Sequence, residues 1–99
     1  MRLDDDTIGR DDMKKTAVHL DPERVAEITD VPVDVIRQLA ELIGTTSPVT
    51  ISAGFGMQRY TNSAQTMRSL IALLAITGNL GKPGAGWVYA NLQSHIFVK

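Results

Sequence analysis

The chain has 99 residues, of which 43% are apolar, and it contains no cysteine. A chain of this length forms one modest domain that buries roughly 65% of the surface its unfolded form exposes, too little for two hydrophobic cores. Without cysteine there is no disulfide bond, no thiolate nucleophile and no cysteine-bound metal or cluster within these residues. The two histidines, His19 and His95, are too few to build a metal site, and no metal ligand is expected.

The sequence carries no signal for a membrane or an export pathway. No run approaches the ~18 consecutive apolar residues that a membrane-spanning helix needs, and the aspartate-rich start is the opposite of a basic signal peptide. We expect a soluble chain with no membrane insertion and no nucleic-acid partner. The compartment stays open, with the cytoplasm slightly favoured.

The net charge of -1 hides an asymmetry between two parts of the chain. Residues 1–41 carry eleven acidic and six basic side chains, whereas residues 42–99 carry four basic side chains and no acidic one. A region without carboxylates favours an anionic partner, because nothing in it repels negative charge. The alternative is that an apolar, glycine-rich region has little surface to carry acids, and charge alone does not separate the two interpretations.

The first part of the sequence predicts a frayed end and two short helices. Residues 1–9 show no period and are expected to be disordered or frayed. Residues 10–20 have acids first and lysines later, as the dipole of a short helix prefers. Asp21 is a good N-cap and Pro22 a good first residue for a helix over residues 22–29.

A longer helix is expected over residues 32–44. Pro32 begins it, and Gly44 is a plausible stop signal. Its apolar side chains recur at the spacing of one helical face. They are Val35, Ile36, Leu39, Ala40, Leu42 and Ile43.

One strand and one apolar helix follow. Residues 48–53 are short and β-branched, and Pro48 stands at the first position, where a missing N–H is tolerated. Residues 62–77 predict a helix that is apolar on nearly every side, and a chain of this length offers too few neighbours to cover it. We therefore expect the chain to self-associate into a homo-oligomer. Residues 78–86 predict an irregular loop, followed by a short extended segment.

This order of elements predicts an α/β fold, a partial Rossmann-like αβα unit with one main strand, a glycine loop and a long helix. Ligands in open α/β sheets bind outside the carboxyl ends of the strands. The stretch GFGMQRYTN, residues 54–62, follows the predicted strand directly. It therefore stands where binding is expected.

Two glycines open this stretch. Gly54 and Gly56 permit backbone angles that are closed to other residues, and they let a ligand approach the main chain closely. The dinucleotide fingerprint needs a third glycine at position 59, where this chain has an arginine. A strained turn without a ligand is the alternative, and in it Phe55 and Tyr60 anchor the loop.

Polar side chains follow the two glycines. Gln58, Arg59 and Asn62 place three planar polar groups within five residues, and Met57 stands beside them. A guanidinium holds phosphate, carboxylate or a polar ring through paired hydrogen bonds. The alternative is a solvated arginine on an ordinary loop.

The loop TGNLGKPGAG has the same two interpretations. Asn79, Gly81 and Gly84 lie in a stretch with few side chains, whose N–H groups suit a phosphate or a pterin edge if the loop lies near residues 54–62. A plain loop also uses such residues. The remaining polar and aromatic residues of the C-terminal part are expected in a core or an interface: Trp87, Tyr89, His95 and Phe97.

No catalytic set is assembled by these residues. The glycine-rich part has no carboxylate to act as an acid or base, and the chain has no thiol. The catalytic residues therefore stay unknown, with Arg59 as a candidate contact to a substrate or cofactor.

Several of these motifs together resemble the molybdopterin oxidoreductase superfamily, of the dimethyl sulfoxide reductase type that includes formate dehydrogenases and nitrate reductases. The resemblance runs from Lys14 to Gly86. It rests on DPERVAEITDVPVDVIRQLAEL, on ISAGFGMQRYTNSAQTMRSLIALLAITGNLGKPGAG and on the spacing between them.

The resemblance implies an internal fragment of a catalytic subunit, in which residues 10–99 are part of a Rossmann-like cofactor-binding domain. Such subunits hold molybdenum or tungsten between two molybdopterin guanine dinucleotides, usually beside a [4Fe-4S] cluster. The implied partners are the rest of that subunit and a small-molecule substrate. The implied cofactor contacts are Gly54, Gly56, Met57, Gln58, Arg59, Asn62, Asn79, Gly81 and Gly84.

The chain also departs from the family pattern. The family often has glutamine where Arg59 stands, histidine where Tyr60 stands and glycine where Ser63 stands, and the match beyond Gly86 is loose. The cluster cysteines, the metal ligand and the C-terminal pterin domain are absent from these residues. We therefore expect a chain that binds no cofactor and is inactive alone; the alternative is a freestanding small α/β binding or assembly module.

Overall fold

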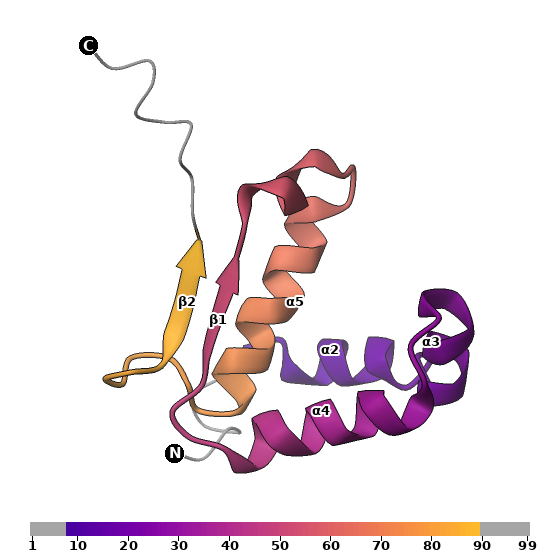
Figure 1. The fold of residues 1–99 in the computed structure, drawn as a ribbon, viewed down its shortest axis with the longest axis horizontal. Helices are drawn as coiled ribbons and strands as arrows, with labels where there is room; N and C mark the ends of the chain where they lie inside the picture. The colour runs from indigo at the N-terminus through magenta and orange to yellow at the C-terminus, as the bar shows by residue number, and fades with distance from the viewer. Residues whose placement is uncertain (1–7, 90–99) are drawn as a thin grey trace. The chain divides into compact units, whose positions relative to one another are not determined.

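The computed structural model describes residues 8–89, and the chain divides into two compact units, Met1–Thr45 and Thr46–Lys99 (Figure 1). The first unit is helical in its described part, and the second combines helix and sheet. The mixed α/β class expected from the sequence is thereby confirmed. His95 and Phe97 lie outside the described residues.

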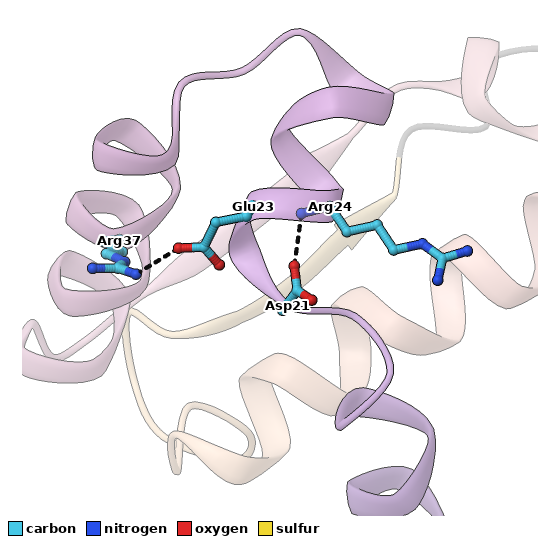
Figure 2. A network of polar contacts seen from close by, with 4 residues as sticks. All are labelled: Asp21, Glu23, Arg24 and Arg37. Carbon is cyan, nitrogen blue, oxygen red and sulfur yellow. Dashed lines mark hydrogen bonds and ion pairs between the residues drawn. The ribbon is translucent and has the colours of Figure 1, made fainter.

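Three helices form the described part of the first unit: α2 (Arg10–Ala17), α3 (Pro22–Thr29) and α4 (Val33–Thr45). All three were predicted from the sequence. The carboxylate of Asp21 accepts a hydrogen bond of 2.7 Å from the N–H of Arg24, which makes Asp21 the N-cap of α3 (Figure 2). Helix α4 runs through Gly44 to Thr45, so the predicted stop signal was wrong; Gly44 has no positive φ and no left-handed cap forms there.

Helices α3 and α4 are joined by an exposed ion pair. The Arg37 guanidinium lies 3.0 Å from the Glu23 carboxylate, and both side chains are 63% exposed (Figure 2). A pair so open to water contributes about 0–1 kcal/mol. None of the residues in α2, α3 and α4 is fully buried, so hydrophobic contact between these helices is limited to half-buried side chains.

The apolar face predicted for α4 is largely uncovered. Val35, Leu39 and Leu42 recur at helical spacing and are 48%, 55% and 60% exposed. Val33, Ile36 and Ile43 are half-buried. The described part of this unit is therefore a set of amphipathic helices without a closed core.

The second unit contains β1 (Thr50–Ala53), the 3-10 helix η1 (Phe55–Arg59), α5 (Ser63–Ile76) and β2 (Gly86–Tyr89). The two strands pair in parallel, with Thr50 opposite Gly86 and Ala53 opposite Tyr89. Helix α5 connects them and contacts both, so the unit is a β-α-β crossover (Figure 1). The extended segment after the loop was expected, but its pairing with β1 was not.

The two faces of the sheet differ in burial. Successive side chains of a strand point to opposite faces. On one face Ala53 is 3% exposed and Ile51, Trp87 and Tyr89 are half-buried, and we infer that α5 covers this face. Thr50, Ser52 and Val88 are exposed on the other face.

Helix α5 has one covered and one uncovered side. Leu74 is fully buried, and Met67 and Leu70 are half-buried at the spacing of the same helical side. Ile71 and Ile76 are 38% and 42% exposed. The apolar circumference noted in the sequence is thus only partly used by the described residues. None of the described helices is long and apolar enough to cross a membrane.

Asn79 joins the end of α5 to the start of β1. Its side chain is fully buried, and its Oδ1 accepts a hydrogen bond of 3.0 Å from the N–H of Val49. Its Nδ2 donates to the hydroxyl and the carbonyl oxygen of Thr77, at 2.9 and 3.3 Å. The Asn79 N–H donates to the Leu74 carbonyl at 2.8 Å. Val49 lies just before the strand, where its N–H has no backbone acceptor among the described residues. The amide oxygen of Asn79 takes the place of that acceptor.

The loop from Thr77 to Gly86 also wraps around the start of β1. The hydroxyl of Thr50 donates to the Gly84 carbonyl at 2.9 Å, and the Gly86 N–H donates to the Val49 carbonyl at 3.1 Å. Gly84 has a φ of +78°, and a Cβ added to it would lie 3.2 Å from Cγ of Pro48. Glycine is therefore required at position 84 both by its backbone angle and by this close contact.

Replacing Asn79 with alanine should destabilise the second unit by about 2 kcal/mol, because the N–H of Val49 then loses its buried acceptor. Urea unfolding of the purified protein measures the loss. Asn62→Ala is the matched control, since the Asn62 side chain makes no capping hydrogen bond, and it should shift stability by less than about 0.5 kcal/mol. Equal effects of the two substitutions would contradict the role given to Asn79.

Alanine at positions 81 and 84 should separate backbone strain from the contact with Pro48. Gly81 and Gly84 have φ values of +74° and +78°, so each substitution should cost about 1–2 kcal/mol in backbone strain. Gly84→Ala should cost about 1 kcal/mol more than Gly81→Ala, because only its Cβ meets another atom within 4 Å. Thermal unfolding of both variants measures the difference. Equal losses of stability would mean that Pro48 can move away from the new Cβ without a free-energy cost.

Candidate functional site

The carboxyl ends of β1 and β2 lie at the same edge of the sheet, because the strands are parallel. Helix η1 follows directly after β1 and lies against the start of α5 (Figure 1). Tyr89 ends β2. We call Gly54 to Arg59 together with Tyr89 the carboxyl edge. Ligands of open α/β sheets bind in this position.

The two glycines of the carboxyl edge do not have unusual backbone angles. Gly54 has a φ of -80°, and Gly56 lies within η1 without a positive φ. The expectation that they use angles closed to other residues was wrong. A Cβ added to either glycine would meet no atom within 4 Å. Neither the local backbone nor the neighbouring side chains therefore require glycine here, and the main chain is open to approach from outside.

Gln58 is held by the opposite strand. The hydroxyl of Tyr89 donates a hydrogen bond of 2.6 Å to Oε1 of Gln58, across 31 residues of sequence. The Tyr89 ring stacks on Trp87, with ring centres 6.5 Å apart and planes inclined by 8°. The sequence interpretation placed Tyr89 in a core or an interface and missed this link, since nothing in the sequence pairs two residues so far apart.

The other candidates of this stretch are open to solvent. Arg59 and Asn62 are exposed, and Met57 is half-buried. The guanidinium of Arg59 makes no hydrogen bond or ion pair with any residue between 8 and 89. Tyr60 is 70% exposed and does not anchor the loop, whereas Phe55 is half-buried. The carboxyl edge thus offers a guanidinium without a partner in the described part of the chain and an amide held by Tyr89.

The second group of candidates lies at the other end of the strands. Asn79, Gly81 and Gly84 belong to the loop that contacts Pro48, Val49 and Thr50, before and at the start of β1. Helix α5, 14 residues and therefore about 21 Å long, separates this loop from η1 (Figure 1). The expectation that the two glycine loops lie near each other was wrong. In a parallel crossover the segment after the helix must return to the amino end of the next strand.

The electrostatics of the second unit favour negative charge. Between residues 46 and 89 the chain carries Arg59, Arg68 and Lys82 and no acidic side chain. The ammonium of Lys82 donates to the Ser47 hydroxyl at 3.1 Å, near the start of β1. Within the described residues no group of three histidine, cysteine, aspartate or glutamate side chains comes together to hold a metal ion. Of these basic side chains only Arg59 belongs to the carboxyl edge, which has no acidic side chain and no metal ligand set among the described residues.

Comparison with curated proteins finds similar oxidoreductases. The chain is 42% identical over 76 residues to the probable dimethyl sulfoxide reductase chain YnfF of Escherichia coli. The matched segment covers 77% of this chain and 9% of that protein. It is 38% identical over 80 residues to formate dehydrogenase H of Escherichia coli, covering 81% of this chain and 11% of the relative. It is 35% identical over 89 residues to the probable oxidoreductase YoaE of Bacillus subtilis, covering 90% and 13%.

The chain thus spans about a tenth of the length of the curated relatives it matches, between 9% and 13% in these three. No family model matches the sequence. No solved structure matches it either. Sequence identity of 35–42% over most of the chain shows common descent with these enzymes. The chain belongs to the molybdopterin oxidoreductase superfamily, in which it corresponds to a segment of the dimethyl sulfoxide reductase and formate dehydrogenase chains.

Proposed function

We propose that this chain is a segment of the catalytic subunit of a molybdenum- or tungsten-dependent oxidoreductase, and that its carboxyl edge contacts a molybdopterin guanine dinucleotide cofactor. The cofactor would supply the redox chemistry. The residues described here would hold and orient its polar or phosphate groups. The [4Fe-4S] cluster, the metal ligand and the small-molecule substrate site belong to other segments of the proposed subunit.

The single observation that carries the proposal is the open main chain at Gly54 and Gly56. Glycine costs about 0.5–1 kcal/mol relative to alanine where its conformational freedom is not used. Neither glycine has a positive φ, and neither is crowded by another atom of the chain. A ligand that approaches the backbone closely gives both positions a reason to lack a side chain.

The chemistry of the neighbouring groups fits the same ligand. Arg59 offers a guanidinium with no partner between residues 8 and 89, and the second unit brings no carboxylate there. Arginine binds phosphate through paired, charge-assisted hydrogen bonds. A guanine dinucleotide carries both phosphates and ring acceptors. We assign Gly54, Gly56, Gln58 and Arg59 to direct contact, with Met57 and Asn62 flanking them.

The loop at the amino end of the strands has a different role in this proposal. Asn79 uses its amide oxygen and its amide nitrogen within the chain, and Gly84 is required by its own backbone. We therefore propose that Asn79 and Gly84 support the cofactor site by holding the β-α-β unit together. The exposed sheet face at Ser52 and Val88 would be covered by further elements of a Rossmann-like domain.

Gly54→Ala and Arg59→Ala, made in the full-length subunit that contains this chain, test the proposal. Each should lower the molybdenum and pterin retained per subunit, Arg59→Ala by about 10- to 150-fold in affinity, because a charge-assisted hydrogen bond contributes about 1.5–3 kcal/mol. Metal analysis and pterin fluorescence measure the retention. Gly44→Ala is the matched control, since Gly44 is also uncrowded and without positive φ but lies on α4.

An unchanged cofactor content in both test variants would contradict the proposed function. The alternative, a freestanding binding or assembly module, would then gain support. Tight docking of the chain on a larger protein without cofactor would identify that alternative. Thermal unfolding of the cofactor-free variants accompanies the measurement, because a misfolded variant unfolds at a lower temperature without cofactor, whereas a variant that has lost only a cofactor contact does not.

A further inference from the structure

Gln58 carries two opposite hydrogen-bonding groups, and the fold uses only one of them. An amide side chain has a carbonyl oxygen that accepts and an NH2 group that donates two hydrogen bonds. The oxygen of Gln58 accepts the hydroxyl of Tyr89 at 2.6 Å. Its NH2 group has no partner among residues 8–89, and the side chain is exposed at the carboxyl edge.

We infer that Tyr89 is a positioning residue, which fixes the Gln58 amide so that it presents its NH2 group to the ligand. This inference rests on the proposed function and deepens it. The ligand atom opposite Gln58 must then be an acceptor, such as a phosphate oxygen, a ring carbonyl oxygen or an unprotonated ring nitrogen. A ligand N–H or O–H donor at that place would find only the second lone pair of Oε1, which already accepts from Tyr89.

Tyr89 is itself held in place. Its ring stacks nearly parallel on Trp87, with planes inclined by 8°, and both residues lie on the face of β2 that α5 covers. Two stacked aromatic rings leave the phenol little freedom to turn away, so its oxygen stays beside the Gln58 amide. This favours the amide orientation seen here, because a phenol is a stronger donor than acceptor, and with the amide reversed Nε2 would have to donate to the phenol oxygen instead.

The neighbouring charges agree with this orientation. Arg59 follows Gln58 directly and also has donors and no acceptor. The second unit has no acidic side chain between residues 46 and 89 that would offer an acceptor to the ligand. Gln58 and Arg59 would therefore both present hydrogen-bond donors to the ligand. Without the amide orientation favoured by Tyr89, Gln58 could turn its acceptor oxygen to the ligand instead.

Three variants of the full-length subunit test the inference through cofactor retention. Tyr89→Phe keeps the ring and its stacking and removes only the hydroxyl, and it should weaken retention about fivefold, the equivalent of one neutral hydrogen bond. Gln58→Glu keeps an acceptor for Tyr89 but replaces the NH2 group with a carboxylate oxygen. It should weaken retention more than Gln58→Ala, because it turns a donor into an acceptor that repels the ligand.

The double variant Tyr89→Phe with Gln58→Ala decides whether Tyr89 acts through Gln58. If it does, the double variant retains as much cofactor as Gln58→Ala alone. Additive losses, or equal retention by Gln58→Glu and Gln58→Ala, would overturn the inference. A purely structural Tyr89 would lower the unfolding temperature without this dependence on Gln58.

The outcome also separates this inference from the proposed function. If Arg59→Ala loses cofactor while the Gln58 and Tyr89 variants keep it, the cofactor site stands and the role of Tyr89 is wrong. If the Arg59 and Gly54 variants also keep it, the proposed function itself fails.

Discussion

The second unit depends on one buried amide. Asn79 binds the strand entry at Val49 and the helix exit at Thr77 at the same time, and it does so while fully buried. A buried amide with unmet hydrogen bonds would cost about 1–3 kcal/mol; here the oxygen and the nitrogen each have a partner inside the chain. Because β1 and β2 are only four residues each, few ladder hydrogen bonds hold the sheet. The side-chain bridge therefore fixes where α5 ends and where β1 begins.

That fixed register has consequences at the other end of the unit. Once β1 and β2 are aligned from Thr50 opposite Gly86, their last residues are also opposite each other, and Ala53 faces Tyr89. Helix η1 begins two residues after Ala53, which brings Gln58 within 2.6 Å of the Tyr89 hydroxyl. The hydrogen bonds of Asn79 at the amino end of the strands thus help to place the Tyr89–Gln58 contact at the carboxyl edge, because the two paired strands keep one register between them.

The helices could be predicted because their signals are local. Asp21 and Pro22 mark the start of α3 within two residues, and the structure places both as expected. The end of α4 was misjudged by one residue, since a glycine permits a left-handed cap without requiring one. The parallel pairing of β2 had no comparable signal. Strand pairing joins residues far apart in sequence, and its register depends on the apolar pattern of both strands and on the geometry of the connection between them.

The candidate site shows the same division between local and distant information. The position of residues 54–62 after a strand was predictable, because the strand and the glycines are adjacent in sequence. The prediction that Asn79 and Gly84 lie near residues 54–62 was wrong, because it assumed a single strand. It did not foresee that the chain after α5 returns to the start of β1 to form β2. A second parallel strand sends the loop after α5 to the amino end, about 21 Å of helix away. Only pairing of β2 with β1 settles that geometry.

The two faces of the sheet in the second unit differ in how far they are covered. A sheet of two parallel strands is marginal by itself, and parallel sheets are normally covered on both faces. Here α5 covers one face, while Ser52 and Val88 are exposed on the other. Further cover would stiffen β1 and β2 and with them the link between Tyr89 and Gln58. In such a protein the donors of the carboxyl edge would become oriented as the surrounding sheet closes, so that folding and ligand recognition would share the same contacts.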